Sequence, residues 1–164
     1  MRSAAFWVQL SRTLPASRTA VYRALTDPAL LTEWWGPHGF TTPGIEVEPK
    51  IGGNYRIAMQ PPEGDVFFLS GEFRRVEPPA HLAFTFRWDP PDPDDQDTLA
   101  SLSLEDRGEE TDVSFTQGPF ATEARRALHE QGWTEGFDRL EQLLTRTAAE
   151  RPDQANDGPN GRPL

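Results

Sequence analysis

The stretch TEARRALHEQGWTEGFDRLEQLLTRTAA, residues 122–149, has the pattern of one long amphipathic helix near the C-terminus, and the rest of the chain is organised around it. Spacings of four, three and four residues place four apolar side chains in a single stripe on this helix: Trp133, Phe137, Leu140 and Leu144. The opposite face carries charged and polar side chains: Glu135, Asp138, Glu141 and Gln142. The helix therefore has one face to bury, and another part of the chain must cover it.

Two glycines, Gly132 and Gly136, lie beside the apolar stripe of this helix. Each glycine inside a helix costs about 1 kcal/mol relative to alanine, so two in one helix need a reason. We expect them to allow either a bend or a close approach of another segment. Thr122, just before the helix, is expected to be its N-cap.

The residues before the helix predict an antiparallel sheet. Phe6–Arg12 alternates apolar and polar side chains, as a half-buried strand does. Two short helices are expected next, one opened by Pro15 and stopped at Asp27, the other over residues 29–35. Six further strands with hairpin-length gaps are expected at 45–48, 55–59, 67–73, 82–88, 99–104 and 111–116. The sequence thus predicts an α+β fold: a curved antiparallel sheet of about seven strands wrapped on the long helix, with two short helices after the first strand.

Composition sets limits on partners and chemistry. The chain of 164 residues is expected to form one domain over 1–149, followed by a disordered tail over 150–164 that is rich in Pro, Gly, Asn and Asp. A net charge of -10 argues against nucleic acid or an anionic membrane as partner. No apolar run approaches a membrane span, and we expect a soluble, cytoplasmic protein. The absence of cysteine excludes disulfides and thiolate chemistry.

Metal binding is not expected. The run from Asp89 to Asp97 holds five aspartates, and we interpret it as a solvated turn. The three histidines, His38, His81 and His129, form no pair at the spacing of a helical metal site. We therefore expect no metal and no cofactor.

Several short segments resemble one protein family when they are taken together and in order. They are ALTDP (24–28), WWGP (34–37), IGGNYR (51–56), GEF (71–73), EPP (77–79) and HEQGW (129–133). This combination resembles the AHSA1-like branch (Activator of Hsp90 ATPase homologue 1-like) of the START/Bet v 1-like, or SRPBCC, superfamily over roughly residues 6–148. The resemblance implies a helix-grip fold, with a cavity between the curved sheet and the long helix that holds an apolar or amphipathic small molecule.

The same resemblance leaves the function open. Members of the superfamily bind lipids, sterols, hormones or polyketides, and a minority act as cyclases or hydrolases. The Hsp90 activator itself is a larger protein with a separate Hsp90-binding domain, so only a weak analogy points to Hsp90. Where relatives often carry a histidine in the final strand, this chain has Thr116-Gln117.

Twelve residues are predicted to contact the ligand, from the strands and from the long helix. They are Trp35, Tyr55, Ile57, Met59, Phe73, Phe84, Phe86, Trp88, Phe115, His129, Trp133 and Phe137. For Phe84, Phe86 and Phe115 a packed core is favoured over a ligand wall, while the tryptophans suit a pocket rim because indole offers an N–H. His129 precedes Trp133 by one turn and is a candidate acid or base, or else a packing residue with one satisfied hydrogen bond.

Three functions remain, in this order: binding of an apolar small molecule, catalysis of the polyketide cyclase or hydrolase type with His129 in the same cavity, and protein interaction through an exposed sheet face as a homodimer or chaperone partner.

Overall fold

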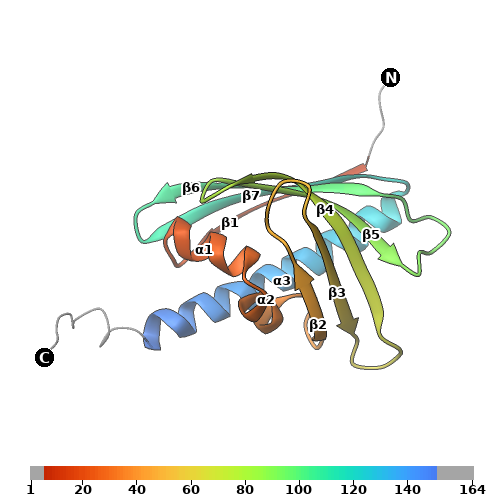
Figure 1. Ribbon diagram of the computed structural model, residues 1–164, viewed down its shortest axis with the longest axis horizontal. Helices are drawn as coiled ribbons and strands as arrows, with labels where there is room; N and C mark the ends of the chain where they lie inside the picture. The colour runs from red at the N-terminus through yellow and green to blue at the C-terminus, as the bar shows by residue number, and fades with distance from the viewer. Residues whose placement is uncertain (1–5, 151–164) are drawn as a thin grey trace, which may run out of the picture.

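The computed structural model describes residues 6–150, with the side chains of residues 6–147, as one curved sheet against a long helix (Figure 1). The elements are β1 (Phe6–Leu14), α1 (Arg18–Thr26), α2 (Pro28–Trp34), β2 (Thr41–Val47), β3 (Asn54–Gln60), β4 (Phe67–Glu77), β5 (His81–Asp89), β6 (Thr98–Arg107), β7 (Glu110–Phe120) and α3 (Glu123–Glu150). The predicted fold class and element order are confirmed. Of the predicted tail, residue 150 belongs to α3, and residues 151–164 lie outside the described residues.

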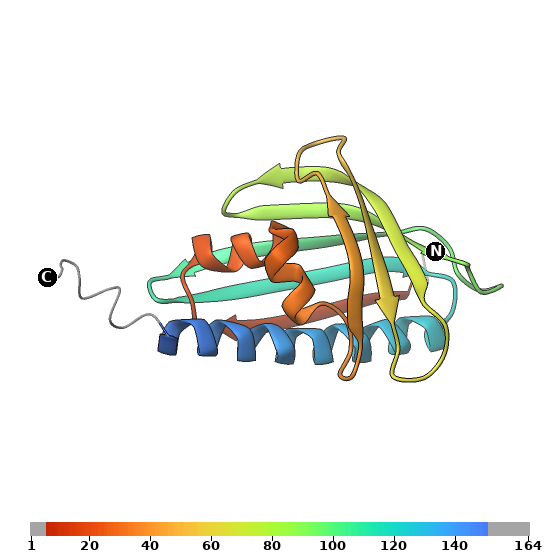
Figure 2. The same ribbon diagram turned by 60° about the horizontal axis from the view of Figure 1, so that its bottom comes forward.

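The seven strands form one antiparallel sheet in the order β1-β7-β6-β5-β4-β3-β2. Consecutive strands from β2 to β7 are neighbours, as hairpin-length connections require. β1 then pairs with β7, which joins the first strand to the last. Figure 2 shows α3 running beside β1, while β2, β3 and β4 curl across the N-terminal half of the helix. The sheet is thus concave toward α3.

Most strands extend beyond their predicted ends, and β7 and β2 show why. β7 was predicted to stop at residue 116, but it continues to Phe120 and pairs Gly118 with Leu99 of β6. The prediction was wrong because Gln117 interrupts the apolar alternation and Gly118-Pro119 reads as a strand breaker. β2 begins at Thr41 rather than Ile45. Its register shifts between Thr41 and Gly44, because it is an edge strand and accommodates a proline there.

The two short helices are fixed by capping and by one buried hydrogen bond. Asp27 ends α1, and its side chain accepts the N–H of Ala29 at 2.9 Å, with Pro28 in the first helical position of α2. Trp34 Nε1, at the end of α2, donates to the carbonyl of Ala24 in α1 at 2.9 Å. This bond places the tryptophan pair 34–35 against the sheet.

The long helix begins as predicted and is anchored at both faces. Thr122 Oγ1 accepts the N–H of Arg125 at 3.1 Å, which confirms the N-cap. On its charged face, Arg12 of β1 pairs with Asp138 at 2.8 Å and Glu141 at 3.4 Å. Within residues 6–150, no helix has the length and apolarity needed to cross a membrane.

Gly132 and Gly136 lie in an uninterrupted α3, beside the loop that follows α2. A Cβ at Gly136 would lie 3.7 Å from the ring of Trp34 and 3.8 Å from the carbonyl oxygen of Gly36. A Cβ at Gly132 would lie 3.8 Å from the ring of Pro37. These are ordinary van der Waals separations, so a Cβ would fit at either position and the loop does not require glycine there.

Candidate functional site

A cavity of about 550 Å³ lies between the N-terminal half of α3 and the concave face of β3, β4 and β5. This volume falls within the range of about 300–1,000 Å³ that is typical of small-molecule sites. Its walls are mainly aromatic and apolar, formed by Trp34, Trp35, Phe40, Met59, Phe67, Leu69, Phe86, Trp88, Leu128 and Trp133. A site of this composition suits an apolar ligand of drug-like size.

Two of the α3 residues that border the cavity carry no side chain. Gly132 and Gly136 line it from the helix, and Gly36 lines it from the loop after α2. One turn further along, Phe137 and Leu140 are buried and fill the space under the helix. The helix therefore packs tightly in its second half and leaves a gap in its first half.

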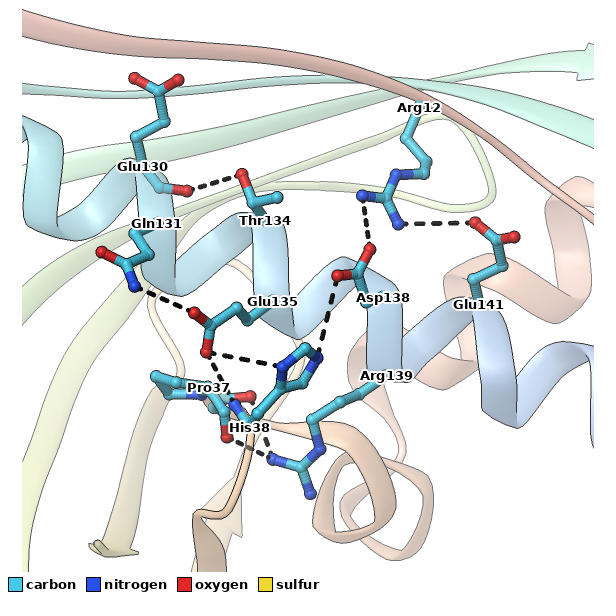
Figure 3. Close-up of polar contacts among 11 residues, drawn as sticks. Arg12, Pro37, His38, Glu130, Gln131, Thr134, Glu135, Asp138, Arg139 and Glu141 are labelled. Atoms are coloured by element: carbon cyan, nitrogen blue, oxygen red, sulfur yellow. Dashed lines mark hydrogen bonds and ion pairs between the residues drawn. The ribbon is translucent and has the colours of Figure 1, made fainter.

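The loop after α2 is held against α3 by polar contacts, so this cavity wall is fixed (Figure 3). One nitrogen of Arg139 donates to three successive carbonyls, those of Trp35 at 2.9 Å and of Gly36 and Pro37 at 3.0 Å each. Glu135 Oε1 accepts the backbone N–H of His38 at 3.0 Å. A cation at the end of α2 also suits its dipole.

His129 is buried in an aromatic surrounding and is neutral. The rings of Phe86, Trp88 and Phe120 lie around it, with centroid distances of 5.3, 5.7 and 4.5 Å. Burial, and secondarily the charge of Arg125, lower the pKa of His129 to about 4.

Trp88 decides the tautomer of His129, because an indole N–H only donates. Trp88 Nε1 donates to His129 Nε2 at 3.1 Å, so the ring proton is on Nδ1. The nitrogen that would accept a proton from a substrate is therefore already occupied. Of the two predicted roles for His129, this geometry favours the packing residue with a satisfied hydrogen bond.

Trp133 is held by a buried polar chain that the sequence analysis missed. Its Nε1 donates to Gln117 Oε1 at 2.8 Å, and Gln117 Nε2 donates to Thr98 Oγ1 at 2.9 Å. Gln117 is 0% exposed. In the sequence, the signal for this chain was a polar residue at an inward-facing position of β7. It was not used, because the strand was predicted to end at residue 116. Gln117 thus orients an indole that forms part of the cavity wall.

The acidic run between β5 and β6 closes one side of the cavity, and its interpretation as a solvated turn needs correction. Arg125 of α3 pairs with Asp92, with Asp94 at 2.9 Å and with Asp95 at 3.5 Å. The guanidinium of Arg125 lowers the pKa of Asp94. Asp92, Asp95 and Arg125 are lining residues of the cavity. Three of the five aspartates therefore attach the loop to α3 through Arg125, and the loop is not only a solvent-exposed turn.

The structure divides the twelve predicted ligand contacts into three groups. Six line the cavity: Trp35, Met59, Phe86, Trp88, His129 and Trp133. Four others, Tyr55, Ile57, Phe73 and Phe84, line a separate void of about 20 Å³. Phe115 and Phe137 are buried in the core against one another, with ring centroids 5.7 Å apart.

The Tyr55 hydroxyl, a predicted donor to a ligand, instead donates to the carbonyl of Thr85 at 2.7 Å. Burial raises the pKa of Tyr55 well above its ordinary value, so this donor keeps its proton. Tyr55 is therefore a structural residue at the sheet.

Several cavity residues were absent from the prediction. Phe67 and Leu69 alternate with outward residues on β4, so the strand pattern could have identified them, whereas Phe40 lies in a loop without periodicity. Among the described residues, no three His, Asp or Glu side chains converge as a metal site would require.

Solved structures with this arrangement come from several bacteria. A protein from Nitrosomonas europaea is 28% identical over 90% of this chain and 99% of its own, with a TM-score of 0.75. A protein from Chromobacterium violaceum is 25% identical over 84% of this chain and 96% of its own, with a TM-score of 0.73. The AHSA1 protein from Silicibacter pomeroyi, 24% identical over 86% of this chain and 99% of its own, shares the fold with a TM-score of 0.76.

No curated protein matches the chain. The family described as Activator of Hsp90 ATPase homolog 1-like protein matches residues 15–145, which include α1 to β7 and most of α3. The six segments that carry the resemblance in the sequence all fall within this range. The chain therefore belongs to the AHSA1-like family.

Proposed function

We propose that this protein binds an apolar or amphipathic small molecule in the cavity between the sheet and α3. The observation that carries this proposal is the cavity of about 550 Å³ with aromatic walls. Protein interiors are close-packed, and voids much larger than a water molecule of about 30 Å³ are few. A gap many times that size, with mainly apolar walls, favours an apolar ligand that would cover those walls.

The rigidity of the walls supports binding by a preformed site. Arg139 holds the loop at Trp35, and Gln117 holds the ring of Trp133. Trp35 and Trp133 also meet edge to face, with centroids 5.3 Å apart. A ligand that enters between fixed walls loses less free energy to the ordering of side chains.

The state of His129 supports binding over catalysis. A general base works best with a pKa near the working pH, and the pKa of this histidine is lowered to about 4. Its Nε2 already accepts from Trp88. Catalysis of the cyclase or hydrolase type, the homodimer and the contact with Hsp90 remain predictions from the sequence and the family.

A titration with the neutral fluorophore N-phenyl-1-naphthylamine tests the proposal. We expect saturable binding with one site per chain, a rise in probe emission and quenching of protein tryptophan. Four of the five tryptophans line the cavity, while Trp7 on β1 is 41% exposed elsewhere. Trp35→Phe should reduce the quenching, and the matched Trp7→Phe should preserve it. Absence of saturable binding, or quenching that depends on Trp7, would overturn the proposal.

A further inference from the structure

The lining residues of the cavity that carry charge are mostly acidic. They are the carboxylates Asp92, Asp95 and Glu135 and the single guanidinium of Arg125. Asp92 and Glu135 are partly exposed, with side-chain exposures of 63% and 25%, so they mark where the cavity meets solvent. The opening therefore carries a local excess of negative charge.

The guanidinium of Arg125 is not free for an anionic ligand. It donates to Asp94 from Nε and to Asp92 from a terminal nitrogen, and Asp95 lies 3.5 Å from Nε. Its side chain is only 16% exposed. A ligand carboxylate would have to displace aspartates that belong to the same loop.

No other lining residue supplies a positive charge at neutral pH. His129 stays uncharged, because its Nε2 accepts from Trp88 and its site is apolar. The net charge of -10 adds a long-range repulsion against anions.

Glu135 differs from the two lining aspartates because its two hydrogen-bond donors are uncharged groups, while the imidazole Nδ1 of His38 lies 3.9 Å from Oε1. Oε1 accepts the backbone N–H of His38 at 3.0 Å, and Oε2 accepts the Gln131 side-chain amide at 3.1 Å (Figure 3). A carboxylate offers about four acceptor positions, so capacity for a further donor or a cation remains. Glu135 thus keeps its charge beside the indoles of the cavity.

We infer that the cavity selects a cationic amphiphile: an apolar body that lies among the tryptophan rings, and an ammonium-type head at the opening beside Glu135. This inference rests on the proposed function and specifies its ligand class. Indole faces attract cations, and nearby carboxylates add to that attraction. The same groups disfavour a fatty-acid carboxylate of equal length.

Three compounds with a ten-carbon chain test the charge preference by displacement of N-phenyl-1-naphthylamine: decyltrimethylammonium, 1-decanol and decanoate. In low salt at pH 7.5, decyltrimethylammonium should bind about tenfold tighter than decanoate, with 1-decanol between them. The ratio should shrink in 0.5 M NaCl, since salt screens partly exposed charges.

A pair of charge-matched variants separates local from global charge. Glu135→Gln should lower the cation-to-anion ratio about threefold. Glu109→Gln, in the β6–β7 turn and not a lining residue, removes the same charge and should leave the ratio unchanged.

The outcomes distinguish this inference from the proposed function. If 1-decanol displaces the probe but decyltrimethylammonium binds no tighter than decanoate, the charge inference fails and the binding function stands. Equal effects of the two variants would also overturn it, because only net charge would then matter. If neither the probe nor 1-decanol binds, both proposals fail.

Discussion

Two regions of the concave sheet face have similar aromatic composition and different packing. The open region is the cavity of about 550 Å³ under the N-terminal half of α3. The closed region, which contains Tyr55, Phe73 and Phe84, is packed down to a void of about 20 Å³. Leu25 of α1 and Leu31 of α2 fill the closed region, whereas Gly132 and Gly136 of α3 leave the open region empty. The covering helices, and not the sheet, decide where space for a ligand remains.

A leucine truncation in the closed region should give the largest effect. Leu82 is 1% exposed there, so Leu82→Ala should lower the free energy of unfolding by about 2–5 kcal/mol through lost burial and a new cavity. Denaturant unfolding measures this change.

The matched control is Leu128→Ala, because Leu128 lines the open region and is 56% exposed. Its effect on stability should stay below about 0.5 kcal/mol. Equal losses in the two variants would show that the two regions do not differ in packing.

Acid should destabilise the open region through His129. Its folded pKa of about 4 lies below the ordinary value of about 6.5, so the unfolded chain binds the proton first as pH falls. The contribution of His129 to the free energy of unfolding is complete above about pH 6.5. It is lost progressively down to about pH 4, by about 3 kcal/mol in total.

Unfolding between pH 7 and pH 4 should therefore differ between the wild type and His129→Gln, whose amide can still accept from Trp88. In His129→Gln, the free energy of unfolding should fall less between pH 7 and pH 4 than in the wild type. In His81→Gln, it should fall as much as in the wild type. A variant with the same pH profile as the wild type would mean that His129 is not held neutral by burial.

The boundary between the two regions depends on Gln117. Trp133 lines both the cavity and the small void, and Gln117 fixes its ring. Gln117→Ala would leave the buried Trp133 N–H without its acceptor, and the free energy of unfolding should fall by about 2 kcal/mol.

The exposed Gln9 of β1 provides the control. Gln9→Ala should change stability by less than about 0.5 kcal/mol. Thermal and denaturant unfolding compare the two variants. If Gln117→Ala leaves the free energy of unfolding unchanged, Gln117 does not hold the Trp133 ring in place.

The sequence predicts the fold better than the cavity, for a physical reason. Alternation along β3 to β5 and the stripe on α3 set which faces are buried, and those faces are confirmed. The same alternation cannot separate Phe86, on the cavity, from Phe84, beside the small void, because both point to the concave face.

What separates them is contact between segments distant in the sequence. Leu31 reaches the level of Phe84, while Phe86 faces His129 of α3 at the wall of the cavity, with ring centroids 5.3 Å apart. Similarly, the pairing of Arg125 with the acidic loop joins residues about thirty positions apart and leaves no periodic signal. The two glycines in α3 were the feature of the sequence that indicated the open region.

Glycine at position 132 leaves room for a ligand beside α3, and substitutions at this position test the proposed site. Gly132→Leu would place an isobutyl group at the cavity wall, while Gly132→Ala gives a similar gain in helix propensity with little added volume. Titration with N-phenyl-1-naphthylamine should show more than tenfold weaker binding for the leucine variant, binding within about threefold of wild type for the alanine variant, and melting temperatures no lower than wild type for both. Equal probe affinity in the leucine variant and the wild type would contradict the claim.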